Sequence, residues 1–156
     1  MLRSITISSI AALPFLFFQP ALAPTCPNIL PHEPLVLFDV SGFTLAGPMD
    51  IQLTVYNDGT ARVCQAQSVG GAVDARVAFV PPAAASQFAR DLSILGAGVL
   101  CDSDNMFSDT PTSTLTILRD ATDSRAHTFS WIGGTAAHSA VEQRVFDFIH
   151  AHFPGF

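Results

Sequence analysis

The chain has 156 residues, of which 13% are charged and 49% are hydrophobic, and its formal net charge is −6. Charged residues are about half as frequent as in an average soluble domain. This low charge, together with the high apolar content, excludes an intrinsically disordered chain. All seven basic residues are Arg and none is Lys. An acidic chain of this kind has no basic surface for a polyanion, so we expect no nucleic-acid partner.

The first 23 residues have the pattern of a secretory signal peptide. Arg3 is their only charge, an apolar stretch follows over residues 10–18, and Ala21-Leu22-Ala23 has the small-x-small pattern of a cleavage site. The apolar stretch is too short to span a bilayer, which needs about 20 residues. We therefore expect an exported protein, periplasmic or extracellular, with no membrane span. Its expected parts are a signal peptide (1–23), a proline-rich lead (24–34) and a single folded domain (35–156).

Alternating hydrophobicity and turn residues predict six strands and two helices. Asn57-Asp58-Gly59 predicts a tight hairpin, because Gly supplies the positive φ that closes the turn. Apolar residues at helical spacing predict a helix that opens at Pro81-Pro82 and stops at Gly96 or Gly98, and a second helix over 140–153. The strands are expected at 35–40, 50–56, 60–67, 75–79, 113–119 and 126–132. The order β-β-β-β-α-β-β-α predicts an α+β domain in which two helices cover one face of a largely antiparallel sheet.

Two local patterns refine this outline. Ser139-x-x-Glu142 has the spacing of a capping box and predicts the start of the last helix. Residues 41–48 are rich in Gly, Ser, Thr and Pro and predict a loop. Phe43 and Leu45 are apolar residues on that loop.

The three cysteines are Cys26, Cys64 and Cys101. In an oxidising compartment two of the three can pair, in any of three ways. Cys64 lies in a predicted strand and Cys101 follows a predicted helix, so both belong to the folded body and we favour this pair. Cys26, in the proline-rich lead, is then free or takes part in a mixed or intermolecular disulfide.

The sequence contains no recognisable catalytic constellation. Neither a Gly-x-Ser-x-Gly elbow nor a His-Glu-x-x-His zinc motif is present. The absence of Lys removes that residue from every catalytic role. We therefore expect a non-enzymatic protein without a cofactor. A small secreted thiol-dependent enzyme, using Cys64 or Cys101, remains an alternative.

The acidic segment 102–109 raises a second alternative, a calcium-stabilised structural domain. Asp102 and Asp104 have the first spacing of an EF-hand loop. Met106 then occupies the next ligand position, and Phe107 replaces the required Gly. We therefore expect no metal site here, and interpret the acidic residues as solvated side chains that cap turns.

Ser41-Gly42-Phe43 and the stretch from Ile51 to Val63, with its Asp58-Gly59 turn, resemble the start of emfourin-like proteins. These are small bacterial domains whose founding member inhibits thermolysin-type metallopeptidases. In that family a helix, a Thr-rich strand pair and a last helix follow. Thr112 to Leu118 would be the Thr-rich strand here. The resemblance implies an α+β fold and a role as an inhibitor of an extracellular peptidase.

A binding role needs a contact surface, and the predicted loop 41–48 offers one. Apolar residues on a polar surface loop often mark an interface. We therefore expect Phe43 and Leu45 to contact the partner, a peptidase or another protein.

Overall fold

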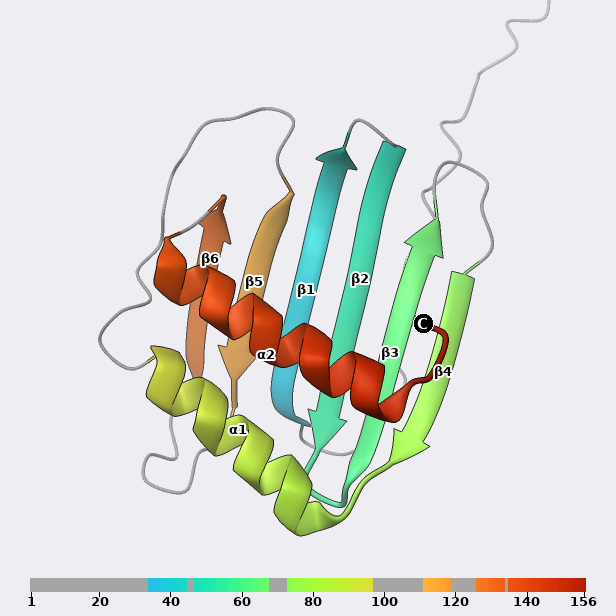
Figure 1. Cartoon of the computed structure of the whole chain (residues 1–156), viewed down its shortest axis with the longest axis vertical. Helices are drawn as coiled ribbons and strands as arrows, with labels where there is room; N and C mark the ends of the chain where they lie inside the picture. The colour runs from blue at the N-terminus through green and yellow to red at the C-terminus, as the bar shows by residue number, and fades with distance from the viewer. Residues whose placement is uncertain (1–33, 45–46, 68–72, 97–110, 119–125, 134) are drawn as a thin grey trace, which may run out of the picture.

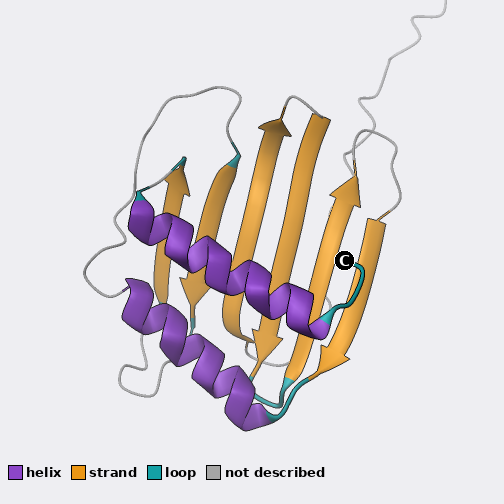
Figure 2. Ribbon diagram, in the orientation of Figure 1, coloured by secondary structure: helices purple, strands orange, loops and turns teal. Residues whose placement is uncertain are grey.

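The computed structural model describes residues 34–44, 47–67, 73–96, 111–118, 126–133 and 135–156. The strands are β1 (Pro34–Thr44), β2 (Gly47–Tyr56), β3 (Thr60–Gln67), β4 (Val73–Phe79), β5 (Thr112–Ile117) and β6 (His127–Ile132), and the helices are α1 (Pro82–Gly96) and α2 (Ala136–His152). The strands form a six-stranded sheet in the order β4-β3-β2-β1-β5-β6, with antiparallel neighbours throughout. Both helices lie on one face of this sheet (Figures 1 and 2). The predicted α+β class and element order are therefore confirmed.

The position of β1 in the middle of the sheet follows from the path of α1. The first four strands are joined in sequence and lie side by side from β1 out to β4. Helix α1 then crosses from the β4 side of the sheet toward the β6 side (Figure 1). The chain can therefore add β5 and β6 to the free edge of β1.

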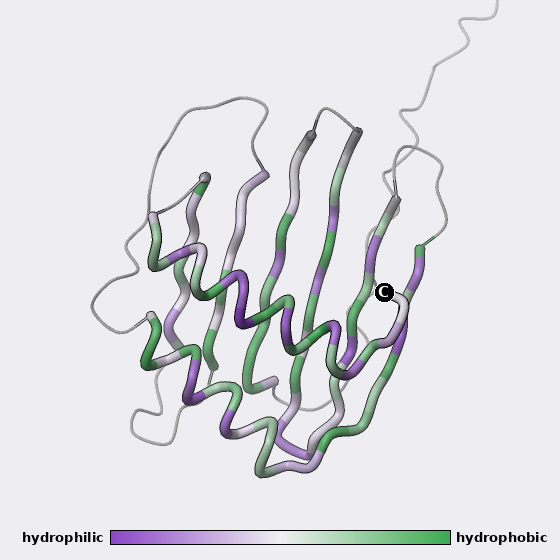
Figure 3. Tube along the Cα trace, in the orientation of Figure 1, coloured by the Kyte–Doolittle hydropathy of each residue, from purple (hydrophilic) through white to green (hydrophobic). Residues whose placement is uncertain are grey.

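The hydrophobic core lies between the sheet and the two helices. Apolar and polar residues alternate along the strands, and each helix carries an apolar stripe (Figure 3). Phe38, Leu53 and Trp131 are fully buried from the sheet side. From the helix side, the rings of Phe88 and Phe148 stack with centroids 4.1 Å apart. Each such large apolar side chain contributes about 1.5–3 kcal/mol relative to an exposed position.

The predicted hairpin at Gly59 is confirmed, and its glycine is required by both conformation and space. Gly59 has φ +88°. Its carbonyl accepts a hydrogen bond from the backbone N–H of Val80 at 2.9 Å. A Cβ at Gly59 would lie 2.0 Å from the carbonyl oxygen of Val80. The turn between β2 and β3 is thereby fastened to the end of β4.

The prediction that residues 41–48 form a loop is wrong. β1 continues to Thr44 and β2 begins at Gly47, with Phe43 opposite Pro48 in the register. Pro48 lacks an N–H group, but it lies beyond Met49, the first residue of β2 that pairs with β3. A proline is tolerated at such a position because β2 has one neighbouring strand there.

The predicted start of the last helix is also wrong, by one helical turn. α2 begins at Ala136 with Thr135 as its N-cap. The backbone N–H of Thr135 donates to Nδ1 of His138 at 2.8 Å. His138 thus takes the role that we assigned to Glu142, and Ser139 lies inside the helix. Neither α1 nor α2, the helices among the described residues, combines the length and apolarity that crossing a membrane requires.

Candidate functional site

Of the two predicted partner-binding residues, Phe43 belongs to the part of the chain that the structure describes and Leu45 does not. Phe43 lies near the end of β1, opposite Pro48 in the β1–β2 pair. Leu45 lies outside the described residues, and so does the acidic segment 102–109. The assignment of Phe43 and Leu45 to a partner surface therefore stays a prediction, as does the interpretation of the acidic segment.

Cys64 lies in the middle of β3, with Gln52 of β2 opposite it on one side and Ala75 of β4 on the other. Its side chain is 1% exposed and takes part in a disulfide bond. A sulfur in a disulfide cannot act as a thiolate nucleophile, which removes Cys64 from the thiol-enzyme alternative. Cys101 lies outside the described residues, so the expected pair Cys64–Cys101 stays a prediction.

A cluster of Ser, His and Glu side chains lies under the start of α2, but its hydrogen bonds are structural. Ser113 Oγ donates to Glu142 Oε1 at 2.7 Å, and Trp131 Nε1 donates to the same oxygen at 2.9 Å. His138 Nδ1 is occupied by the N–H of Thr135. In this arrangement Ser113 donates to a carboxylate that also accepts from Trp131, and the ring nitrogen of His138 bonded here is engaged with Thr135. These contacts join β5 and β6 to α2 and do not form the Ser–His pair of a serine hydrolase.

The most exposed apolar surface of the described residues lies on edge strand β4. Side chains along β4 alternate strictly between more and less exposed positions. The exposed positions are Val73, Ala75, Val77 and Phe79, which we call the β4 outer row. Val77 is 56% exposed and Phe79 is 83% exposed, and Val73 is also among the large apolar residues exposed to solvent. Isolated exposed apolar residues are common on protein surfaces, whereas a contiguous row of them marks an interaction site.

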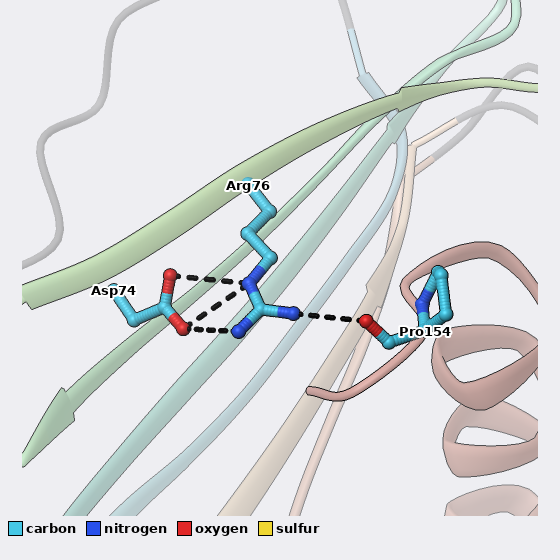
Figure 4. Close-up of polar contacts among 3 residues, drawn as sticks. All are labelled: Asp74, Arg76 and Pro154. Atoms are coloured by element: carbon cyan, nitrogen blue, oxygen red, sulfur yellow. Dashed lines mark hydrogen bonds and ion pairs between the residues drawn. The ribbon is translucent and has the colours of Figure 1, made fainter.

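The charged residues of β4 point to the opposite face, toward the helices. Arg76 binds Asp74 through a 2.7 Å ion pair and donates from Nη1 to the carbonyl oxygen of Pro154 at 3.1 Å (Figure 4). Its guanidinium also lies 5.6 Å from the ring centroid of Phe156. Arg76 therefore holds the C-terminal residues against the inner side of β4. Because both charged residues of the strand point inward, the β4 outer row carries no charge.

β4 also has an open backbone edge within the described part of the chain. It is the terminal strand of the sheet and pairs with β3. Seven consecutive residue pairs join β3 to β4, from Thr60–Phe79 to Ala66–Val73, without a bulge. Edge strands are often protected from further pairing by a Lys, a Pro, a bulge or an inward-pointing charge. β4 has no Lys, Pro or bulge between Val73 and Phe79, and its two inward-pointing charges, Asp74 and Arg76, are paired with each other. The strand therefore presents a regular backbone edge together with an apolar row.

No protein-family model matches the chain, and a search of curated proteins finds no significant relative. A role for the β4 outer row is therefore supported by the geometry of β4 and not by a related protein.

Sequence reasoning identified β4 as a strand but did not identify its outer row. Apolar Val77 and Phe79 alternate with Arg76 and Ala78, a pattern that is typical of a strand with its apolar side on the core. In the structure the apolar side is exposed and Arg76 points inward. The pattern Asp74-x-Arg76 was the one feature that could have indicated the true orientation of β4, because these two charges lie on one face of the strand and can neutralise each other there.

Proposed function

We propose that this chain is an exported, non-enzymatic protein-binding domain that takes up an extended segment of a partner protein along β4. The observation that carries the proposal is the β4 outer row, in which Val77 and Phe79 are exposed on a regular edge strand. An open strand edge supplies unpaired N–H and C=O groups, and an added strand can bond to them.

The two faces of β4 define the chemistry of the segment that it would accept. An added strand places alternate side chains on opposite faces of the sheet. Those on the outer face would lie beside Val77 and Phe79 and should be apolar. Those on the inner face would lie beside the Asp74–Arg76 pair and should be polar. The partner segment is therefore an extended stretch of alternating apolar and polar residues.

Two sequence features support an exported inhibitor in particular. Residues 1–23 have the pattern of a signal peptide, which directs the domain to where extracellular peptidases act. The resemblance to emfourin-like proteins implies a metallopeptidase as the partner. Phe43 and Leu45 remain the contact residues expected from the sequence and would form a second point of contact.

The test is to mix the mature domain with a panel of thermolysin-type extracellular peptidases, and to measure their activity and complex formation. We expect loss of peptidase activity at micromolar inhibitor or below. Val77→Lys and Phe79→Asp should weaken the complex at least tenfold, because charges on the row oppose an apolar neighbour. The matched control is Ile94→Asp on α1, where an equally apolar side chain is 74% exposed away from β4.

Two results would count against this function. Unchanged peptidase activity and no complex at micromolar concentration would remove the peptidase as the partner. Sedimentation showing a dimer that Val77→Lys dissociates would instead assign β4 to a second copy of the chain.

A further inference from the structure

The open edge of β4 presents the backbone groups of the same residues that form the β4 outer row. Opposing pairs in an antiparallel ladder alternate between hydrogen-bonded and non-hydrogen-bonded pairs. The backbone N–H of Val80 donates to the carbonyl oxygen of Gly59 at 2.9 Å, and this pair continues the register of β3 and β4. The alternation then turns the N–H and C=O groups of Asp74 and Arg76 toward β3. It turns those of the β4 outer row toward the open edge.

The next pair along the register agrees with this alternation. Thr60 is opposite Phe79, and its N–H donates to Oδ1 of Asp58 at 2.8 Å rather than across the ladder. The backbone groups of Phe79 are therefore directed away from β3, where an added strand can bond to them.

An antiparallel strand added at this edge would continue the pattern of the sheet, in which every neighbouring pair is antiparallel. Its hydrogen-bonded pairs would form with the β4 outer row. Asp74 and Arg76 would then lie in non-hydrogen-bonded pairs, where Cα atoms are about 4.5 Å apart instead of about 5.5 Å. Side chains approach each other most closely in such pairs, so these two charges would act on the added strand at short range.

The ion pair between Asp74 and Arg76 leaves both groups able to bind a further charge. Their side chains are 43% and 37% exposed. Arg76 donates from Nε and Nη2 to Asp74 and from Nη1 to the carbonyl oxygen of Pro154 (Figure 4). Each terminal nitrogen of a guanidinium carries a pair of N–H groups, so Nη1 and Nη2 both keep one N–H outside these bonds. Within the described residues, Oδ1 of Asp74 accepts from Arg76 Nε alone, and a carboxylate oxygen can accept more than one hydrogen bond.

Inward-pointing charges protect an edge strand from unselective pairing. An apolar side chain opposite Arg76 would remove water from the guanidinium without replacing its hydrogen bonds, which costs free energy. A side chain of like charge opposite Arg76 or Asp74 would be repelled. The two charges therefore select among added strands, because a strand with the opposite charge at each position avoids both penalties.

We propose that β4 selects a segment in which an acidic residue is followed two positions later by a basic residue, with apolar residues on both sides of each. This inference rests on the proposed function and names the class of segment that β4 binds. An antiparallel strand runs opposite to β4, so its acidic residue meets Arg76 and its later basic residue meets Asp74. A parallel strand would need the basic residue first. The order of the charges therefore reports the direction of the bound segment.

β4 itself carries this charge order, since Asp74 precedes Arg76 between apolar residues. A second copy paired in this register would place Val73 opposite Val77 of the copy. Phe79, which at 83% is the most exposed large apolar side chain of the described residues, would then lie beyond the β4 of the copy. A partner segment as long as β4 covers Phe79 as well, so the partner segment is the occupant that uses the whole row.

Two labelled peptides of identical composition test the charge order by fluorescence anisotropy with the exported protein. The acid-first peptide is Val-Thr-Val-Glu-Val-Lys-Val, and the base-first peptide is Val-Thr-Val-Lys-Val-Glu-Val. Both match the seven residues of β4 and place Thr opposite the small, uncharged Ala78. We expect the acid-first peptide to bind at least about fivefold more tightly. The preference should shrink in about 1 M NaCl, because charges are then screened beyond about 3 Å.

An exchange of the two charges on the protein provides the matched variant. Asp74→Arg combined with Arg76→Asp keeps the net charge and an ion pair on β4, and the preference should reverse to the base-first peptide. Ile94→Asp, at an exposed position of α1, should keep the original preference. Emission of the single buried Trp131 reports whether each variant is folded.

Four results would overturn the inference, and they separate it from the proposed function. Equal binding of both peptides, weakened alike by Phe79→Asp, would keep β4 as a binding edge and remove the selection by charge. Tighter binding of the base-first peptide to the wild type would remove the antiparallel order. A dimer of the free protein in sedimentation would assign the charge order to a second copy. Failure of both peptides to bind at millimolar concentration would overturn the proposed function as well.

Discussion

Trp131 on β6 donates a hydrogen bond from Nε1 to Glu142 Oε1 on α2, at 2.9 Å. Ser113 on β5 donates to the same oxygen at 2.7 Å. One half-buried carboxylate thus ties the helix to two strands that lie beneath it. Hydrogen bonds to a charged acceptor contribute more than neutral ones, and their loss leaves buried donors unsatisfied.

Glu142→Ala should lower the free energy of unfolding by about 2–4 kcal/mol, because two donors lose their acceptor. Glu142→Gln keeps an acceptor oxygen and should cost less. Urea unfolding followed by Trp131 emission measures both. The control is Gln143→Ala, whose side chain bonds to Asp147 on the exposed side of α2. A loss below about 1 kcal/mol for Glu142→Ala would contradict the structural role of this carboxylate.

Gly59→Ala should destabilise the domain more than Gly133→Ala. Both glycines have positive φ, so each substitution costs about 1–2 kcal/mol from backbone conformation. At Gly59 the new Cβ would also meet the Val80 carbonyl, whereas nothing lies within 4 Å at Gly133. Thermal unfolding should therefore show the larger decrease in Tm for Gly59→Ala. Equal decreases in Tm for the two variants would mean that the turn at Gly59 moves to accommodate the new Cβ at no cost in free energy.

The ion pair between Asp91 of α1 and Arg144 of α2 should stabilise the domain in a pH-dependent way. Arg144 Nη2 lies 2.8 Å from Asp91 Oδ2. The hydrogen bond from Arg144 lowers the pKa of Asp91 below its usual 3.8, and Gln87 adds to this effect. A depressed carboxyl pKa adds stability above the ordinary value, and this stability is lost as the pH falls through the folded-state pKa.

Asp91→Asn should therefore cost about 0.5–1 kcal/mol at pH 7, because the pair is partly exposed. The difference in urea midpoint between Asp91→Asn and wild type should vanish in acid, once the Asp91 carboxylate of the wild type is protonated. Urea midpoints at several pH values between 7 and 2 measure this. Asp147→Asn, on the exposed side of α2, is the control and should change the midpoint little. A cost of Asp91→Asn that persists undiminished in acid would exclude a charge effect.

The charged form of Asp39 should destabilise the domain at neutral pH, whereas that of Asp91 stabilises it. Burial raises its pKa, the nearby Asp50 carboxylate raises it further, and a hydrogen bond from Ser41 opposes both. The penalty on the charged form is absent below the ordinary pKa near 3.8, and it grows as the pH rises through the higher folded-state value. Asp39→Asn should therefore raise the urea midpoint at pH 7 and leave it unchanged at about pH 3. A lower midpoint at pH 7 would show that the carboxylate makes a contact worth more than its burial costs.

The element order, the Gly59 hairpin and the apolar stripes of both helices could be predicted from the amino-acid sequence. These features depend on neighbours within a few residues. Gly59 supplies the positive φ of its own turn, and Val141, Val145 and Phe148 lie on one side of their helix because of its 3.6-residue period. Local signals failed at the start of α2, because Thr135 with His138 and Ser139 with Glu142 offer capping patterns one turn apart. Contacts with Ser113 and Trp131 give Glu142 another role.

The covered face of β4 and the direction of the Cys64 side chain could not be predicted in this way. Both depend on residues distant in sequence. Arg76 turns inward to Pro154, 78 positions away, which leaves Val77 and Phe79 on the outside. Cys64 faces away from the helices because Val63, beside it in β3, packs toward them. Alternation along a strand fixes two faces but not their direction, since the direction is set when the strand joins its sheet and the helices cover one side.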